Sequence, residues 1–303
     1  MPQSISAAAD DCLTQVLRDA TLDEPRTRLF FPCPDTMLEA SETQSLPSII
    51  GDAIKRLVFA VQDYSLLTFR SLTNILTPPH YWFDALEQMD LIGVGSLPIV
   101  VLTGFFIGGV MVLQTASQFE RFGETALTGD AVSLALVREL GPAITALLVA
   151  GRNASGMASE LGSMVVTEQV DAMRALGTDP IRRLMTPRVI ATVTMLPLLT
   201  AISDFVGLIG GFIVAYFTLR LGPVQFWTRA IDALDFGDLA QGFAKPVVFA
   251  LIIASVGCYQ GLRVRGGTQG VGRATTSAVV ISSVLVLVGD FFLSRLLLFI
   301  FHK

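Results

Sequence analysis

The chain has 303 residues, of which 52% are hydrophobic and only 16% charged, and its mean hydropathy is +0.62. Soluble globular proteins carry about 25% charged residues, so this composition excludes an ordinary soluble domain and indicates several transmembrane helices. The formal net charge is −5, but eight of the 26 acidic and three of the 21 basic residues lie in residues 1–48, which leaves 18 of each sign elsewhere. We therefore expect an acidic leader joined to an electrically balanced membrane domain, with no nucleic-acid partner.

The leader, residues 1–48, has no basic start and no apolar core, so it does not fit a cleavable signal peptide. Its composition predicts a mostly disordered cytoplasmic segment. Cys12, Cys33 and Cys258 form no CxxC or CxxH pattern, and we expect neither a structural disulfide nor a metal site.

The membrane domain, residues 49–303, opens with a segment at 49–77 in which apolar residues recur near helical spacing while charged residues interrupt them. A soluble core helix has this pattern, but directly before a membrane domain it favours an amphipathic helix lying in the interface. The aromatic run Tyr81, Trp82 and Phe83 that follows suits the headgroup level.

Long apolar stretches then predict an all-α integral membrane protein. The five expected spans are at about 91–119, 131–161, 189–219, 246–262 and 274–301. In the first of them Gly104, Gly108 and Gly109 suggest close helix packing.

The arginines of the loops predict the orientation. The loops after the second and fourth spans are the arginine-rich ones, with Arg174, Arg182, Arg183 and Arg188 in the first and Arg263, Arg265 and Arg273 in the second. Cytoplasmic loops are enriched in Lys and Arg, so we expect a cytoplasmic N-terminus and, with five spans, a periplasmic C-terminus.

The second span contains charged residues. Between Glu139 and Arg152 only about a dozen residues are uncharged, roughly 18 Å of helix, whereas a bilayer core needs about 30 Å. The span must begin near residue 131, which places Arg138 and Glu139 roughly a third of the way in, at a cost of about 2.5–3.5 kcal/mol each. Two interpretations stay open: an ion pair that fixes helix packing, or a polar site lining a central cavity.

Further along this span, Gly151, Ser155 and Ser159 recur every four residues. Such small-residue ridges let helices approach closely, and we predict a helix-packing role for them.

The loop after the second span carries a short predicted helix at 168–176, with Val170, Met173 and Leu176 on one side and Gly177 as its terminator. An ordinary loop helix has this form, but an apolar-faced helix between two spans also suits docking to a partner on the cytoplasmic side. The sequence contains no Walker motif GxxxxGK[ST], so the chain is not expected to bind ATP through a P-loop.

Four stretches together resemble the MlaE (YrbE) family of ABC-transporter permeases: "RELGPAITALLVAGR", "ELGSMVVTEQVDAMRALGTDPIRRLMTPRVIA", "LPLLT" and "GVGRATTSAVVISSVLVLVGDFFLS". The resemblance covers about residues 50–303 and leaves out the leader. It implies an interfacial helix followed by five spans, a homodimer in the bacterial inner membrane, two cytoplasmic ATPase subunits, a periplasmic MCE-domain lipid-binding protein and, often, a small STAS-domain subunit. The implied cargo is phospholipid moved between the inner and outer membranes.

Residue by residue, the resemblance implies that Arg138, Glu139 and Leu140 lie at the lipid-binding cavity. It places the helix that couples to the ATPase at Glu168, Gln169, Val170, Asp171 and Met173. ATP and magnesium would be bound by the partner, so the chain itself is expected to carry no cofactor and no enzymatic activity.

Two other classes of function remain as alternatives. A proton-coupled secondary transporter of a lipid or hydrophobic compound would use Glu139, Asp204 or Asp290 as its proton carrier, but the sequence lacks an internal repeat of the usual kind. An intramembrane enzyme would need a catalytic constellation, and the two histidines, His80 and His302, lie at the edges of the predicted spans.

Overall fold

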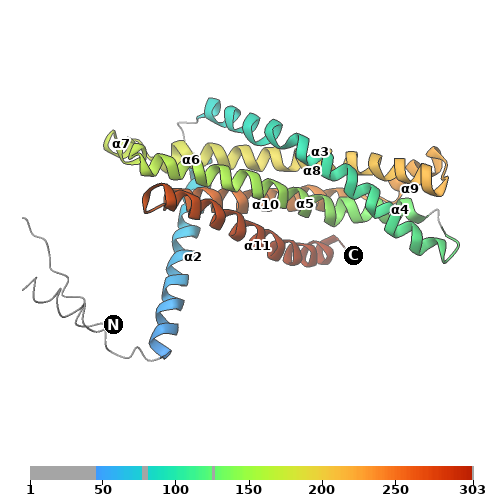
Figure 1. The fold of residues 1–303 in the computed structure, drawn as a ribbon, viewed down its shortest axis with the longest axis horizontal. Coiled ribbons are helices and arrows are strands. Elements are labelled where there is room, and N and C mark those ends of the chain that lie inside the picture. Colours follow the sequence, from blue (N-terminus) through green and yellow to red (C-terminus); the bar gives the residue numbers. More distant parts are fainter. Residues whose placement is uncertain (1–45, 77–80, 125–126, 302–303) are drawn as a thin grey trace, which may run out of the picture. The chain divides into compact units, whose positions relative to one another are not determined.

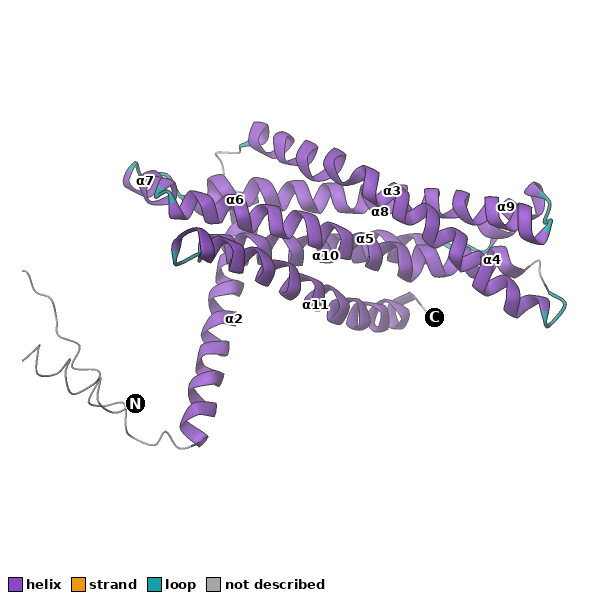
Figure 2. Ribbon diagram, in the orientation of Figure 1, coloured by secondary structure: helices purple, strands orange, loops and turns teal. Residues whose placement is uncertain are grey.

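The computed structural model describes residues 46–76, 81–124 and 127–301, and within these ranges every regular element is a helix (Figure 1, Figure 2). Five helical stretches are long and apolar enough to cross a membrane: 82–120, 128–166, 181–219, 236–262 and 267–300. The prediction of an all-α membrane protein is confirmed. Almost all of the acidic leader lies outside the described residues.

The helices follow one another with short connections. In chain order they are α2 (Leu46–Leu76), α3 (Trp82–Glu120), α4 (Thr128–Ala135), α5 (Gly141–Val149), α6 (Ser155–Val166), α7 (Gln169–Ala175), α8 (Thr186–Val214), α9 (Pro223–Asp232), α10 (Phe236–Leu262) and α11 (Gly267–Phe301). Within the described residues, η3 (Leu136–Leu140) and η4 (Ala150–Ala154) are π-helical segments that interrupt the second span, whereas η5 (Ile181–Met185) begins the third span and η6 (Ala215–Leu219) ends it. Through η3 and η4 the helices α4, α5 and α6 form one continuous second span.

The helices begin earlier than the apolar runs that predicted them. α10 starts at Phe236 rather than near residue 246, because Asp235 and Asp238 form a capping box at its N-terminus. Such a box supplies acceptors for the free N–H groups of the first turn. Hydropathy detects the part of a helix that lies in lipid, and these polar first turns are invisible to it.

α3 and α8 pack backbone against backbone inside the compact unit formed by residues 56–303. A Cβ added to Gly108 would lie 1.8 Å from the carbonyl oxygen of Gly207, and one added to Gly210 would lie 2.1 Å from that of Phe105. Lipid tails are as apolar as the helices, so such close contacts rather than the hydrophobic effect hold spans together. The expected role of Gly108 in close packing is present in the structure.

We predict that Gly108→Ala destabilises the protein by about 1–3 kcal/mol, because the added methyl group forces α3 and α8 apart. The measurement is thermal unfolding in detergent. Gly156→Ala is the matched control, since a Cβ at that position of α6 meets no atom within 4 Å. Equal stability of the two variants would contradict the backbone contact.

The predicted ridge of Gly151, Ser155 and Ser159 does not make the close approach within the chain. A Cβ on Gly151 would meet nothing within 4 Å, and Ser159 is exposed. The residues that pack are Ala154 and Ala158, which are fully buried against Gly257 and Gly261 of α10. The pattern identified a run of small residues, but Ala154 and Ala158, each one position before Ser155 and Ser159, lie on the side of the helix that faces α10.

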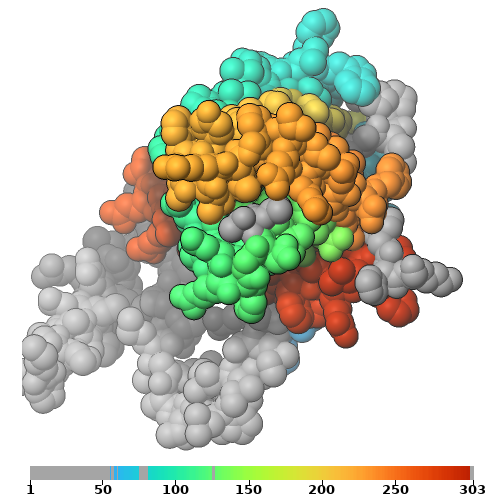
Figure 3. All heavy atoms as spheres, turned by 90° about the vertical axis from the view of Figure 1, so that its right-hand side faces the viewer, coloured from blue at the N-terminus to red at the C-terminus, as the bar shows by residue number. Residues whose placement is uncertain are grey.

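The two ends of the helix bundle carry different short helices, α9 at one end and α7 at the other (Figure 1). At the α9 end, α4 and α9 lie side by side (Figure 3): a Cβ on Gly129 would be 3.2 Å from the carbonyl oxygen of Phe226, and Arg229 lies 3.7 Å from Asp130. The opposite end carries α7.

α2 is amphipathic. Its polar side contacts α10 and Arg263, the residue directly after α10. Tyr64 shares a 2.5 Å hydrogen bond with Ser255 of α10, and Asp63 forms an ion pair with Arg263. Its other side leaves large apolar residues exposed, namely Val58, Phe59, Val61, Leu66 and Phe69. This division is typical of a helix lying in the membrane interface.

Candidate functional site

A fully buried lysine, Lys245 on α10, is the centre of the polar site. Its ammonium group donates hydrogen bonds to Glu139 Oε2 (2.6 Å), to Ser294 Oγ (2.8 Å) and to the main-chain carbonyl of Arg138 (2.8 Å). Asp290 Oδ1 lies 3.3 Å away. An ammonium group has three N–H donors, so this set of acceptors satisfies it, as a buried charge requires.

The main-chain acceptor for Lys245 is available because of a proline. In a regular α-helix the carbonyl of Arg138 would accept the N–H of residue 142, but Pro142 has none. Pro142 lies in the first turn of α5, directly after η3. The "RELGP" sequence thus places two charged side chains in a π-helical segment, a feature frequent at functional sites, and removes the α-helical donor to the Arg138 carbonyl that accepts Lys245.

The cluster extends from the buried lysine to accessible carboxylates. The side chain of Lys245 is 0% exposed, whereas those of Asp290 and Glu139 are 20% and 45% exposed. Ser294, one turn after Asp290 on α11, donates to Glu139 Oε2 at 3.0 Å. Three helical segments, η3, α10 and α11, therefore present a charged surface that a ligand can reach.

Arg138 has a partner of its own. Its Nε and Nη2 lie 2.6 and 2.5 Å from Asp238 Oδ1, and the Asp238 side chain is 3% exposed. The other oxygen of Asp238 accepts the main-chain N–H of Asp235, at 3.1 Å, in the α10 capping box. The Arg138 side chain is 36% exposed, and its Nη1 makes no hydrogen bond to a described residue.

The ion pair that the sequence suggests between the neighbours Arg138 and Glu139 is not formed in this structure. The two side chains are neighbours in sequence, but each forms its ion pair with α10, Arg138 with Asp238 and Glu139 with Lys245. Consecutive residues point in different directions around a helix, so they meet different partners.

Leu140, the third residue predicted for the cavity, lies beside an apolar hollow. The hollow has a volume of about 410 Å³, and its other wall is α3, through Leu102, Thr103, Phe106, Ile107, Val110 and Met111. Leu140 directly follows Glu139, so η3 contributes one residue to the charged cluster and the next residue to the apolar hollow. That combination suits a ligand with an apolar tail and a polar head.

The short helix predicted at 168–176 is present as α7 (Gln169–Ala175). Glu168 precedes it with a left-handed backbone (φ 59°), and Gly177 follows it with φ 77°. Both residues are exposed, as are Gln169, Asp171 and Leu176, and Asp171 pairs with Arg174 at 3.0 Å. A short, sharply bounded helix is thus displayed at this end of the bundle.

One residue of α7, Val170, does not face outward. Val170 is only 3% exposed and Met173 is partly buried, whereas Leu176 is 83% exposed. The prediction that Val170 fills a groove of the partner is wrong, because its side chain packs inside its own chain. Leu176 is the apolar side chain that is free to contact another protein.

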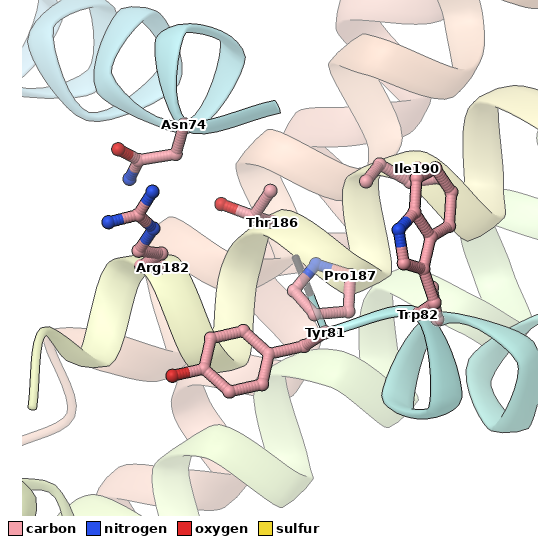
Figure 4. Close-up of a pocket in the computed structure, with 8 residues that line it drawn as sticks. Asn74, Tyr81, Trp82, Arg182, Thr186, Pro187 and Ile190 are labelled. Carbon is pink, nitrogen blue, oxygen red and sulfur yellow. The ribbon is translucent and has the colours of Figure 1, made fainter. Parts of the chain in front are cut away.

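Close to the same end, the start of α3 meets the start of α8 and the end of α2. Figure 4 shows Asn74, Tyr81, Trp82 and Arg182 around a cavity of about 10 Å³. That is room for about one water molecule, so this is a packed junction rather than a ligand site. The guanidinium of Arg183 lies 5.7 Å from the centre of the Tyr81 ring, and this cation–π contact adds to the junction.

Sequence reasoning missed Lys245, Asp238 and Ser294. The predicted span bounds leave Lys245 and Asp238 in the loop between the third and fourth spans, and the sequence presents Asp290 only as a proton carrier of the alternative transporter. One signal was available: Lys245 directly precedes a stretch of 17 residues without charge, a position where a lysine is either at the interface or buried with a partner.

These features place the chain in a class of proteins: multi-pass membrane proteins with a buried charged cluster and a short helix exposed at one end of the bundle. The model of the permease MlaE family matches residues 85–296. A probable ABC transporter permease protein of Rickettsia typhi is 39% identical over 253 residues, which is 84% of this chain and 98% of that protein. The chain belongs to the MlaE family of ABC transporter permeases.

Two further relatives come from photosynthetic organisms. A probable ABC transporter permease protein of Synechocystis is 42% identical over 214 residues, 71% of this chain and 81% of that protein. The chloroplastic protein TRIGALACTOSYLDIACYLGLYCEROL 1 of Arabidopsis thaliana is 39% identical over 221 residues, 73% of this chain and 63% of that protein.

Proposed function

We propose that this permease moves phospholipid between the inner and outer membranes. The observation that carries the proposal is that η3 contributes Glu139 to the Lys245 cluster and the next residue, Leu140, to an apolar hollow. A phospholipid needs an apolar path for its tails and polar partners for its head. Arg138, with Nη1 unengaged, is suited to phosphate. The name of the Arabidopsis relative includes a galactosyl diacylglycerol, which supports a glycerolipid as the class of cargo.

The proposed machine includes other chains. An ABC permease implies an ATPase partner, which would bind ATP and magnesium and perform the hydrolysis, so the chain itself is not catalytic. We further propose a homodimer in the bacterial inner membrane, a periplasmic MCE-domain protein that receives or delivers the lipid, and in some assemblies a STAS-domain subunit. α11 leaves a long apolar face exposed, including Val280, Val284, Leu287 and Phe291, which is available to lipid or to a second copy.

The test of the proposal is mass spectrometry of lipids retained by the purified complex, followed by lipid transfer between vesicles. We expect bound phospholipid and transfer that requires ATP. Lipid content no higher than that of an unrelated membrane protein purified in the same way would contradict the proposal. Transfer that needs a proton gradient but no ATP would instead support the secondary transporter. Membership in an ABC permease family speaks against that alternative.

We predict that Leu176→Asp weakens ATPase binding about tenfold, which corresponds to about 1.4 kcal/mol. Its apolar side chain is exposed on the segment proposed to dock in the ATPase, and an introduced charge opposes helix-in-groove packing. Co-purification and ATPase activity measure the effect. The matched control is Val224→Asp, which introduces the same charge at an exposed apolar residue of α9, at the opposite end of the bundle. Unchanged ATPase binding would remove α7 from the interface.

We also predict the orientation of the chain. With the arginine-rich loops in the cytoplasm, we expect a reporter fused before Met1 to lie in the cytoplasm and one fused after Lys303 to lie in the periplasm. Paired alkaline phosphatase and fluorescent protein fusions measure this. Both ends on one side of the membrane would contradict five crossings.

A further inference from the structure

A second hollow, separate from the Lys245 cluster, lies between η3, α8 and α10. It has a volume of about 180 Å³, and its lining includes Val137, Asp204, Phe205, Leu239, Gly242 and Phe243. None of the charged residues of the Lys245 cluster lines it. Apart from Asp204, the side chains in its wall are apolar.

Asp204 is the unusual feature of this hollow. Its Oδ1 is shielded from solvent and accepts no hydrogen bond, and no described lysine or arginine forms an ion pair with it. The oxygen lies where a side chain of residue 141 would be: a Cβ on Gly141 would come within 1.6 Å of it. A buried polar atom without a partner is unfavourable by about 1–3 kcal/mol, and such atoms are rare enough in proteins to need a cause.

The mouth of the hollow is aromatic. Phe205 on α8 is 59% exposed and Phe243 on α10 is 49% exposed. Aromatic faces attract cations, and ammonium groups are recognised by several rings at once. Together, the Asp204 carboxylate and the two phenylalanine rings suit an amphiphile with an ammonium group and an apolar chain. A neutral alcohol fits less well, because it would form no cation–π contact with the rings.

The size of the hollow limits what enters it. Its volume of about 180 Å³ is below the roughly 300–1,000 Å³ of pockets that bury a drug-sized ligand. This is enough for an ammonium group and a few methylene groups, and not enough for a whole phospholipid.

We propose that this hollow binds the ammonium group of an amphiphile, with Asp204 as its hydrogen-bond acceptor and Phe205 and Phe243 against its cationic face. An aminophospholipid headgroup and a free alkylamine share this chemistry. The site does not depend on the proposed transport function, since binding here requires only the side chains of α8 and α10.

The experiment uses the full chain in phosphatidylglycerol nanodiscs, with radiolabelled decylammonium and decanol as probes and empty nanodiscs as the background. We expect saturable binding of decylammonium to the wild type. Asp204→Asn should weaken it at least tenfold while leaving decanol binding unchanged. Asp232→Asn, which removes an exposed carboxylate of α9, should bind like the wild type.

A second variant tests the site independently of whether Asp204→Asn folds. Ala201→Leu adds volume to the wall of the hollow and should abolish saturable binding of the amine without removing any charge. Nanodiscs of constant phosphatidylglycerol content, with the remaining lipid either phosphatidylethanolamine or an uncharged glycolipid, distinguish the two sources: a lower apparent affinity for decylammonium in phosphatidylethanolamine identifies the aminophospholipid as the natural occupant, and an unchanged one identifies a free amine. Wild-type affinity in Asp204→Asn, or equal weakening of amine and alcohol, would overturn the proposal.

Discussion

Replacement of Lys245 by methionine is expected to destabilise the protein by about 3–5 kcal/mol, because removal of one partner from a buried ion pair leaves the other charges uncompensated. Lys245 is fully buried and contacts Glu139 and Asp290, so the variant would hold two carboxylates and no cation at this point. Thermal unfolding in detergent measures the effect. Lys55→Met is the matched control, since Lys55 is exposed on α2 and its loss should change stability by less than about 0.5 kcal/mol.

The same variant can separate a structural role from a functional one. If the cluster only holds helices together, Lys245→Met combined with Glu139→Leu and Asp290→Asn should recover both stability and lipid transfer, because apolar replacement of a buried ion pair is often neutral. If the cluster binds the lipid head, the triple variant should recover stability and still fail to transfer lipid. Full transfer by a stable triple variant would contradict the proposed site.

The sequence was sufficient for the architecture because each span is a local property. Uncharged runs longer than a bilayer core are readable without any knowledge of contacts, and so were the glycines at which α3 approaches α8. The first turns of the helices were not predictable in this way, since Asp235 and Asp238 start α10 through capping rather than through hydropathy.

The partners in the site could not be predicted, because they are distant in sequence. Glu139 and Lys245 are 106 positions apart, and nothing in a single sequence pairs them. The nearest opposite charge to Arg138 along the chain is Glu139, and proximity in sequence suggested the wrong pair. The prediction for Val170 was wrong for a related reason. An apolar residue on a loop helix can face either its own bundle or a partner, and the sequence pattern is the same in both cases.

The second large effect is expected at Arg138. Arg138→Met should destabilise by about 2–3 kcal/mol, since it strands Asp238, whose side chain is 3% exposed, and charged hydrogen bonds contribute about 1.5–3 kcal/mol each. A double-mutant cycle with Asp238→Asn should show an interaction of about 1–3 kcal/mol, as residues in contact do. The corresponding cycle of Arg138→Met with Glu139→Gln should be additive to within about 0.5 kcal/mol. Coupling to Glu139 rather than to Asp238 would restore the pairing first inferred from the sequence.

Arg138→Lys tests what the arginine does beyond this ion pair. Lysine keeps the charge and can still reach a carboxylate, so stability should change by less than about 1 kcal/mol. It lacks the planar fork through which a guanidinium engages Asp238 on one side while Nη1 remains available to a phosphate on the other. Loss of one charged hydrogen bond to the lipid, near 1.4 kcal/mol, lowers transfer about tenfold. A lysine variant that is stable and transfers lipid at the wild-type rate would show that Arg138 positions α10 and does not hold the headgroup.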